Sequence, residues 1–152
     1  MRIAIGCDEA AFQLKEIIRQ LIESKGHEVR DFGTYDAETK VLYPDIGFAV
    51  ATCIQRGECE RGILICGTGI GMSISANKVD SIRAAVCHDI YSTRRSVLSN
   101  NCQIMCMGSR VIGPETAKSM VEEWLTLNYI DGPSTEKIDR ITEYEHKTFT
   151  CS

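Results

Sequence analysis

Short apolar runs alternate with segments of helical periodicity along the chain, and this alternation constrains the fold more than any other feature. The run at 62–66, GILIC, is apolar throughout, which is typical of a strand covered on both faces. We expect strands at 2–7, 27–33, 62–66, 82–87 and 103–108. Because strands that alternate with helices form βαβ units, the pattern predicts an α/β fold with a parallel sheet.

The segments between and after these runs predict helices. Apolar residues from Leu14 to Ile22 recur at helical spacing. Pro44 is placed to start the next helix, which extends toward Gly57. Further helices are expected over 72–78, 89–99, 114–128 and 135–146. No internal repeat or domain boundary interrupts the pattern, so we expect a single domain over residues 1–152.

Charge and hydropathy argue against several classes of protein. The formal net charge is −4 at pH 7, and Lys and Arg are scattered, so a nucleic-acid partner is not expected. No apolar run approaches the roughly 20 residues of a transmembrane helix, so no membrane partner is expected. The N-terminus enters a strand without a signal peptide, which predicts a cytoplasmic protein. The negative net charge does not exclude acidic small-molecule substrates, because such a substrate needs only a local positive site.

The chain has eight cysteines, which is many for its length. No CxxC pair occurs, and the Cys and His spacing matches no zinc site, so we expect no metal. Most of the cysteines lie in apolar runs or on a helix face, which favours buried reduced thiols over a disulfide framework.

The carboxyl ends of parallel strands meet at one edge of a sheet, where ligands bind in such folds. This rule brings together the stretches GCDE, YPD, CGTGIG, CHDIYS and GSRVIG. Asp8 fits either a helix cap or a contact to a substrate hydroxyl, and the ring of Tyr43 could pack on a sugar. His88 has no clear partner, and Arg110 is the best local candidate for a phosphate ligand.

Cys66 stands at the mouth of the glycine-rich turn GTGIG and allows two interpretations. Amides of such a turn favour a thiolate and can hold an oxyanion, and Gly67, Gly69 and Gly71 let a substrate approach the backbone closely. A small buried cysteine in a tight strand-to-helix turn accounts for the same residues. The turn does not match the GxGxxG dinucleotide signature, and it lacks the lysine of a P-loop.

Taken together, CGTGIGMSISANK, IRAAVCHDIYS and MGSRVIGPE resemble the ribose-5-phosphate isomerase B family, which also contains galactose-6-phosphate isomerase. The stretches IAIGCDEAAFQLKEII, DFGTY and YPD resemble it too, so the resemblance extends from the first strand to about residue 140. It implies a three-layer α/β/α Rossmann-like sandwich with a five-stranded parallel sheet of order 2-1-3-5-4. It also implies a homodimer or tetramer with shared active sites, acting on a small phosphorylated sugar without a metal or other cofactor.

The implied reaction is an aldose–ketose isomerisation through a cis-enediolate, by default of ribose 5-phosphate and ribulose 5-phosphate. Cys66 matches the base that moves a proton between C1 and C2, and Thr68 would hydrogen-bond the substrate. The implied substrate-binding residues are Asp8, Tyr43, Gly67, Gly69, Ile70, Gly71, Asn100, Arg110 and Lys137. The amides of residues 67–71 would stabilise the enediolate, Arg110 would bind phosphate, and Asn100 would come from the partner chain.

Three stretches depart from the family pattern. Ser99, in VLSNN, takes the place of a histidine to which the resemblance assigns opening of the furanose ring, and serine has no titratable group near neutral pH. The usual Asp-His after the first strand is Asp8-Glu9 here. The usual GGRHxxR becomes DGPSTEK, so Pro133 and Lys137 replace two arginines.

These departures support two alternatives to the default activity. A tetrose 4-phosphate cannot close a five-membered ring because its O4 carries the phosphate, so it needs no ring-opening residue. The pattern SNNxQI…MGSRVIG also resembles the branch acting on D-erythrulose 4-phosphate, which favours a D-erythrulose 4-phosphate/D-erythrose 4-phosphate isomerase. The second alternative is a non-catalytic phosphosugar-binding module. Retention of Cys66, Thr68 and the glycines argues against it, because binding alone needs no thiol.

Overall fold

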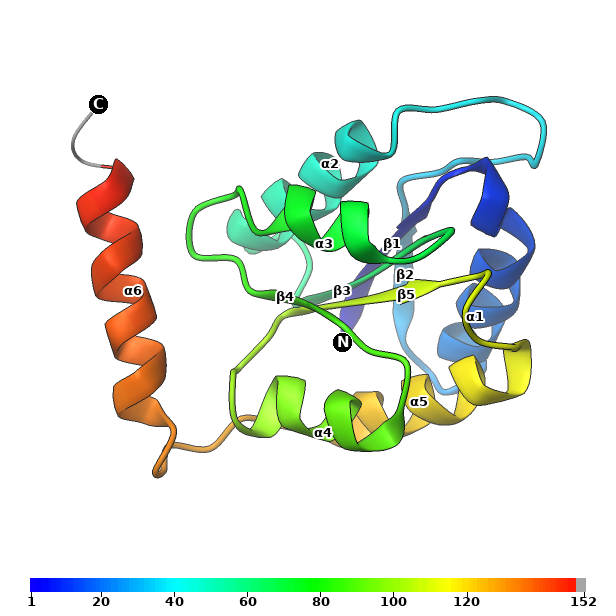
Figure 1. The fold of residues 1–152 in the computed structure, drawn as a ribbon. Coiled ribbons are helices and arrows are strands. Elements are labelled where there is room, and N and C mark those ends of the chain that lie inside the picture. Colours follow the sequence, from blue (N-terminus) through cyan, green and yellow to red (C-terminus); the bar gives the residue numbers. More distant parts are fainter. Residues whose placement is uncertain (150–152) are drawn as a thin grey trace.

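The structure, a computed structural model, describes residues 1–149 and shows a five-stranded sheet between two layers of helices (Figure 1). The strands are β1 (Arg2–Cys7), β2 (Glu28–Asp31), β3 (Arg61–Cys66), β4 (Ala84–Val86) and β5 (Ile104–Gly108). Their order is β2-β1-β3-β5-β4, and each pairing is parallel. The predicted α/β/α fold and its strand order are therefore confirmed.

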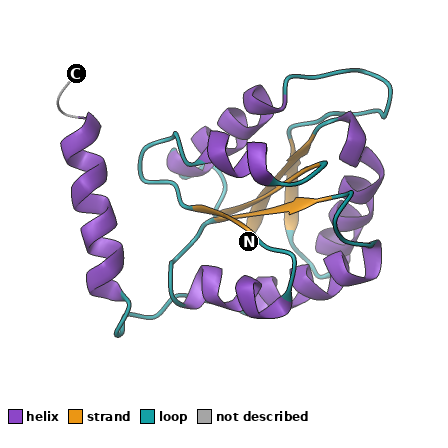
Figure 2. Cartoon of the chain, viewed as in Figure 1, coloured by secondary structure: helices purple, strands orange, loops and turns teal. Residues whose placement is uncertain are grey.

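The helices are α1 (Phe12–Ser24), α2 (Tyr43–Gln55), α3 (Ile70–Ala76), α4 (Ile90–Leu98), α5 (Pro114–Thr126) and α6 (Thr135–Phe149). A 3-10 helix, η1 (Glu9–Ala11), precedes α1. Helices α2 and α3 cover one face of the sheet, and α1, α4 and α5 cover the other (Figure 1). Helix α6 stands beside this body, and a long loop joins β2 to α2 (Figure 2).

Side chains of the central strands alternate between the two helical layers. In β3, Ile63 and Ile65 belong to the core packed against α1, α4 and α5. Leu64 and Cys66 belong to the core packed against α2 and α3. The last residue of β3 therefore directs its thiol toward the α2/α3 side of the sheet.

A buried lysine holds the carboxyl end of β1. Lys15, on α1, is fully buried, and its Nζ lies 2.6 Å from Asp31 Oδ2 and donates to the carbonyl oxygen of Thr34 at 2.8 Å. The same segment pairs with Cys7, whose amide donates to the Gly33 carbonyl at 2.6 Å. Because a buried ammonium requires such partners, the segment after β2 stays against the end of β1, where Asp8 follows.

The structure corrects several local predictions. Asp8 does not cap a helix through its side chain, because η1 intervenes and the amide of Ala11 donates to the Asp8 backbone carbonyl. Strand β2 ends at Asp31, two residues before Gly33, which has a positive φ of 85°. Helix α3 begins at Ile70 rather than at residue 72, directly after the glycine turn. Pro44 stands in the first turn of α2, as predicted.

The seven described cysteines are buried free thiols, and Cys151 lies outside the described residues. Within residues 1–149, no group of three or more His, Cys, Asp and Glu side chains is arranged to hold a metal ion. The helices of this described part are too short or too polar to cross a membrane.

Candidate active site

The glycine turn after β3 brings a backbone amide to the Cys66 sulfur. Gly69 has a left-handed φ of 78°, and its N–H donates to Cys66 Sγ at 3.1 Å. This conformation favours glycine because a Cβ would strain it. A hydrogen bond from an amide stabilises the thiolate form of a cysteine. Cys66 is 5% exposed, so the turn presents a nearly covered thiol whose sulfur already has a donor.

The turn lies directly on the end of β5. A Cβ at Gly69 would come within 2.9 Å of the Met107 carbonyl carbon, and one at Gly108 would lie 2.7 Å from the Thr68 Cα. Two hydrogen bonds fasten the same contact, from the Ser109 amide to the Cys66 carbonyl at 2.8 Å and from the Arg110 amide to the Gly67 carbonyl at 3.1 Å. The position of the thiol therefore depends on where β5 ends.

Thr68 is exposed at the outer side of the turn. Its Oγ1 accepts a hydrogen bond from the Ile70 amide at 3.3 Å. Because the hydroxyl oxygen is used as the acceptor, the hydroxyl hydrogen is free to be donated to a bound molecule.

A positive and a negative side chain border the turn. A Cβ at Gly67 would lie 3.5 Å from Arg110 Nη1, so the exposed guanidinium passes beside the backbone of the turn. Asp8 Oδ1 is buried and has no hydrogen-bond partner among the described residues. Burial raises the pKa of the Asp8 carboxyl and Glu9 raises it further, whereas the backbone amides of Ala11 and Ala10, and then Arg110, oppose the shift. An unpartnered buried oxygen beside an arginine suits a ligand that brings its own hydroxyl.

Tyr43, the first residue of α2, packs against the far end of the turn. A Cβ at Gly71 would lie 2.5 Å from its ring and 2.8 Å from its hydroxyl oxygen, so only glycine leaves room for the ring. Tyr43 is 40% exposed, and the exposed part forms an aromatic wall. The predicted packing of Tyr43 on a sugar stays a prediction.

Two contacts at this edge were not foreseen from the sequence. Glu9 Oε2 accepts a hydrogen bond from the Val41 amide at 3.3 Å, so this carboxylate holds the loop before α2. His88 Nε2 accepts a hydrogen bond from the Gly108 amide at 2.8 Å. The sequence does not indicate either contact, because the partner of Glu9 and the partner of His88 are each a backbone amide far away in the sequence.

Asn100 lies at the opposite edge of the sheet. Its carbonyl accepts a hydrogen bond from Arg83 Nε at 3.1 Å, and Arg83 directly precedes β4. Its side chain donates to the Arg95 carbonyl at 3.1 Å. Ser99 Oγ accepts from Arg95 Nε at 2.6 Å. Because α4 returns from the carboxyl edge to the amino edge, one chain does not bring Asn100 to Cys66.

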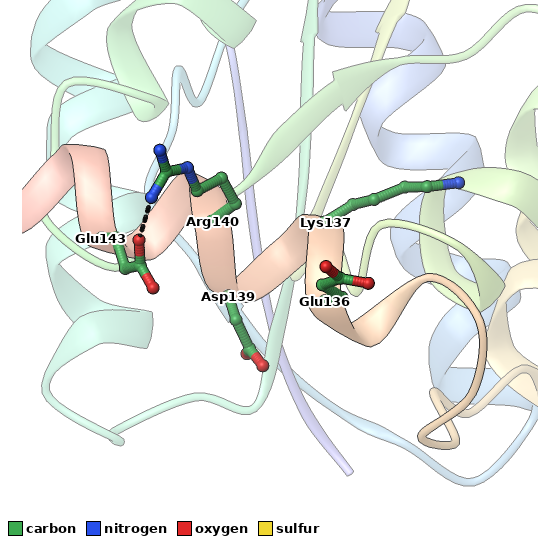
Figure 3. A pocket seen from close by; sticks show the side chains of 5 residues that line it. All are labelled: Glu136, Lys137, Asp139, Arg140 and Glu143. Atoms are coloured by element: carbon green, nitrogen blue, oxygen red, sulfur yellow. Dashed lines mark hydrogen bonds and ion pairs between the residues drawn. The ribbon is translucent and has the colours of Figure 1, made fainter.

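Lys137 also lies away from the turn, on α6. The Ser81 amide donates to Glu145 Oε1 at 2.9 Å, which ties α6 to the loop before β4. An open hollow of about 820 Å³ borders this helix (Figure 3). Its lining residues are Glu136, Lys137, Asp139, Arg140 and Glu143. Arg140 pairs with Glu143 at 2.6 Å, whereas Lys137 extends away from that pair (Figure 3). The lining residues of the hollow are all charged, and none of them belongs to the Cys66 turn.

Comparison with known proteins places the chain in a family. Residues 3–141 match the family model described as Ribose/Galactose Isomerase. The chain belongs to this family. The predictions of a sugar-phosphate isomerase and of an aldose–ketose isomerisation are thereby confirmed at the level of the family.

Relatives in this family carry different names. The chain is 46% identical over 147 residues to the D-erythrulose-4-phosphate isomerase of Pectobacterium atrosepticum, covering 97% of each protein. It is 47% identical over 147 residues to the ribose-5-P isomerase B of Listeria innocua, covering 97% of this chain and 99% of that one. The structure matches that of Clostridium thermocellum ribose-5-phosphate isomerase B with a TM-score of 0.94 at 44% identity, covering 97% and 99% of the two chains.

Gly69→Ala should destabilise the fold more than Gly57→Ala. Both glycines have left-handed φ values, 78° and 70°, so each alanine costs about 1–2 kcal/mol in backbone strain. Nothing lies within 4 Å of a Cβ at Gly57, whereas a Cβ at Gly69 collides with the Met107 backbone. Urea unfolding of the two variants measures the difference. Equal losses of stability would show that the turn is not seated on β5.

Proposed function

We propose that the chain interconverts an aldose phosphate and a ketose phosphate, with Cys66 as the base that moves a proton between C1 and C2. The observation that carries the proposal is the Gly69 amide donating to Cys66 Sγ at 3.1 Å, at the end of β3. Binding alone does not need a thiol with an amide donor, so this contact favours the enzyme over a non-catalytic phosphosugar-binding module.

In this mechanism the thiolate of Cys66 removes the proton from the carbon beside the carbonyl. The negative charge moves to the two oxygens of a cis-enediolate. These oxygens lie beside the backbone amides of residues 67–71, which include the amide of Ile70. Amides aimed at developing charge stabilise it without reorganisation. The Thr68 hydroxyl, whose oxygen already accepts from Ile70, donates to the same oxygens. In the direction from aldose to ketose, the hydroxyl proton of the enediolate moves from the C2 oxygen to the C1 oxygen. The thiol then returns its proton to C1, so no proton is gained or lost overall.

The side chains around the turn bind the rest of the substrate. Arg110 supplies the positive charge for the phosphate, because its guanidinium passes beside Gly67. Asp8 Oδ1 accepts a substrate hydroxyl, which would satisfy its empty acceptor position. The exposed part of the Tyr43 side chain packs against the sugar. The Glu9 carboxylate stays negatively charged and accepts from the Val41 amide, so the phosphate binds on the Arg110 side of the turn.

We further propose that the preferred substrate is an open-chain tetrose 4-phosphate, interconverting D-erythrose 4-phosphate and D-erythrulose 4-phosphate. Ring opening needs an acid–base group near neutral pH, and Ser99 has none. The lone pair of His88 Nε2 is occupied by the Gly108 amide. His88 Nε2 therefore does not serve as the ring-opening base in place of the histidine that is missing at position 99. Isomerisation of ribose 5-phosphate and ribulose 5-phosphate is the second candidate. It is favoured by the 47% identity to a ribose-5-P isomerase B.

The active unit proposed here is a homodimer, or a tetramer made of two such dimers, with shared sites. Asn100 and Lys137 lie at the amino edge of the sheet, on the other side from Cys66. Only a second chain can bring them to the turn. Large apolar side chains exposed on α3 and α6 support the pairing; they are Ile70, Ile74, Ile141 and Tyr144.

Cys66→Ala should lower kcat by about 100- to 10,000-fold, because a positioned acid–base group contributes that much. Cys66→Ser should be nearly as poor, since a hydroxyl is a much weaker acid–base group than a thiol. Titration calorimetry with 4-phospho-D-erythronate should show that both variants still bind a phosphorylated ligand. Cys102→Ala is the matched control, because this buried cysteine lies at the other sheet edge. Full activity in Cys66→Ala would reject the assigned base.

A panel of sugar phosphates should show the highest kcat/KM with the tetrose 4-phosphates, with or without a chelator. Ser99→His should raise kcat/KM for ribose 5-phosphate and leave the tetrose activity largely unchanged, because only the pentose closes a furanose ring. A coupled assay for each product measures both effects. A clear preference of the unmodified chain for ribose 5-phosphate would replace the tetrose proposal with the second candidate.

Mixing Cys66→Ala with Asn100→Ala should restore activity that neither variant has alone. In a mixed dimer one site carries both defects and the other carries none. Random exchange should therefore recover about a quarter of the unmodified activity. The assay is turnover after subunit exchange, with each variant mixed with itself as the control. Failure to recover activity from mixed dimers, verified by mass spectrometry, would show that the sites are not shared.

A further inference from the structure

His88 lies two residues beyond β4, at the same sheet edge as Cys66. Its Nε2 accepts the Gly108 amide at 2.8 Å, across to the end of β5. An imidazole nitrogen accepts a hydrogen bond only when it carries no proton, so the ring is neutral with its hydrogen on Nδ1. The half-buried ring therefore has a defined protonation state and a defined tautomer in this fold.

Gly108 is the residue on which the thiol-bearing turn rests. A Cβ added there would lie 2.7 Å from the Thr68 Cα and 2.9 Å from the Gly67 carbonyl oxygen. The next residue, Ser109, donates its amide to the Cys66 carbonyl at 2.8 Å. A shift of the Gly108 peptide would therefore move both Thr68 and the backbone of Cys66.

We propose that His88 is a positioning residue for the isomerisation: its neutral imidazole holds the Gly108 amide and thereby sets the place of the Cys66 turn. This inference rests on the proposed function. It assigns His88 a role other than ring opening, because His88 Nε2 already accepts a hydrogen bond from the Gly108 amide. No proton passes through His88 in the reaction.

The charges around His88 agree with this role. Burial lowers the pKa of the imidazole and Asp89 opposes the shift, so the ring is neutral at pH 7. The Asp89 carboxylate accepts from the Ser92 amide at 2.7 Å and caps α4. Burial raises the pKa of the Cys87 thiol, which stays neutral. From the segment after β5, Arg110 lies against Gly67 on the substrate side of the turn.

His88→Ala should lower kcat by about 10-fold or more, with a smaller change in KM, because the Gly108 amide loses its acceptor and the turn shifts. His88→Gln should restore most of kcat, since its side-chain carbonyl can accept the same amide but cannot act as an acid or base. His27→Gln is the matched control. This histidine lies beside the chain amino group at the amino end of β2, and its replacement should leave kcat unchanged.

The pH dependence separates positioning from a merely structural contact. As pH falls, Nε2 takes up a proton, becomes a donor and can no longer accept the Gly108 amide. In the unmodified chain kcat should therefore fall through the His88 pKa, below the ordinary value of about 6.5. His88→Gln should lack this part of the fall. Titration of the substrate phosphate is common to both proteins and so cancels in the comparison.

Three outcomes would overturn the inference. The first is unchanged kcat in His88→Ala, and the second is a His88→Gln variant as poor as His88→Ala or with the same acid limb. The third is a long-range nitrogen–proton NMR spectrum of the unmodified chain that places the His88 proton on Nε2. This spectrum needs no turnover and no variant. If the unmodified chain converts no sugar phosphate, the proposed function and the positioning role both fail. The NMR spectrum would still show whether His88 Nε2 accepts the Gly108 amide.

Discussion

The contact between the glycine turn and the end of β5 is the constraint on which the site depends. The backbone of Gly69 lies against Met107, and that of Gly108 lies against Thr68, at distances that leave no space for a side chain. Close approach of two backbones makes the turn rigid, because a peptide group has few ways to move without a clash. The same packing holds the Gly69 amide at the Cys66 sulfur.

The parallel sheet then decides which residues can share a site. Each strand ends at the carboxyl edge, and each helix returns the chain to the amino edge before the next strand begins. The carboxyl edge carries the predicted site residues Asp8, Tyr43, Cys66 and Arg110, which lie at the end of a strand, shortly after one, or at the start of a helix. Asn100 follows α4 and so lies at the other edge. A site that uses residues from both edges, as proposed here, requires two chains, which gives a physical reason for the proposed dimer.

The proton chemistry at this edge bears on the substrate. Ser99 cannot titrate near neutral pH, and the unprotonated nitrogen of His88, Nε2, accepts a hydrogen bond from the Gly108 amide. The thiol is the acid–base group within the turn itself, and the proposed mechanism uses it for the carbon-to-carbon proton transfer. A substrate that is already acyclic needs nothing more. Identity to relatives does not separate the candidates, because the values for the two named activities are 46% and 47%.

Periodicity and glycine placement determined much of this protein from the sequence alone. They located five strands, a parallel sheet and a thiol at a glycine turn, because burial on both faces of a strand and a left-handed turn each require particular residue types. The strand order followed from the resemblance. Only the tertiary structure decided that the Asp8 side chain makes no capping hydrogen bond, that Glu9 faces Val41, that His88 holds Gly108 and that Asn100 lies at the other edge from Cys66. The Glu9 and His88 contacts each depend on a backbone amide brought close from a distant part of the chain. A backbone amide is the same at every position, so the sequence does not mark which one a side chain will meet.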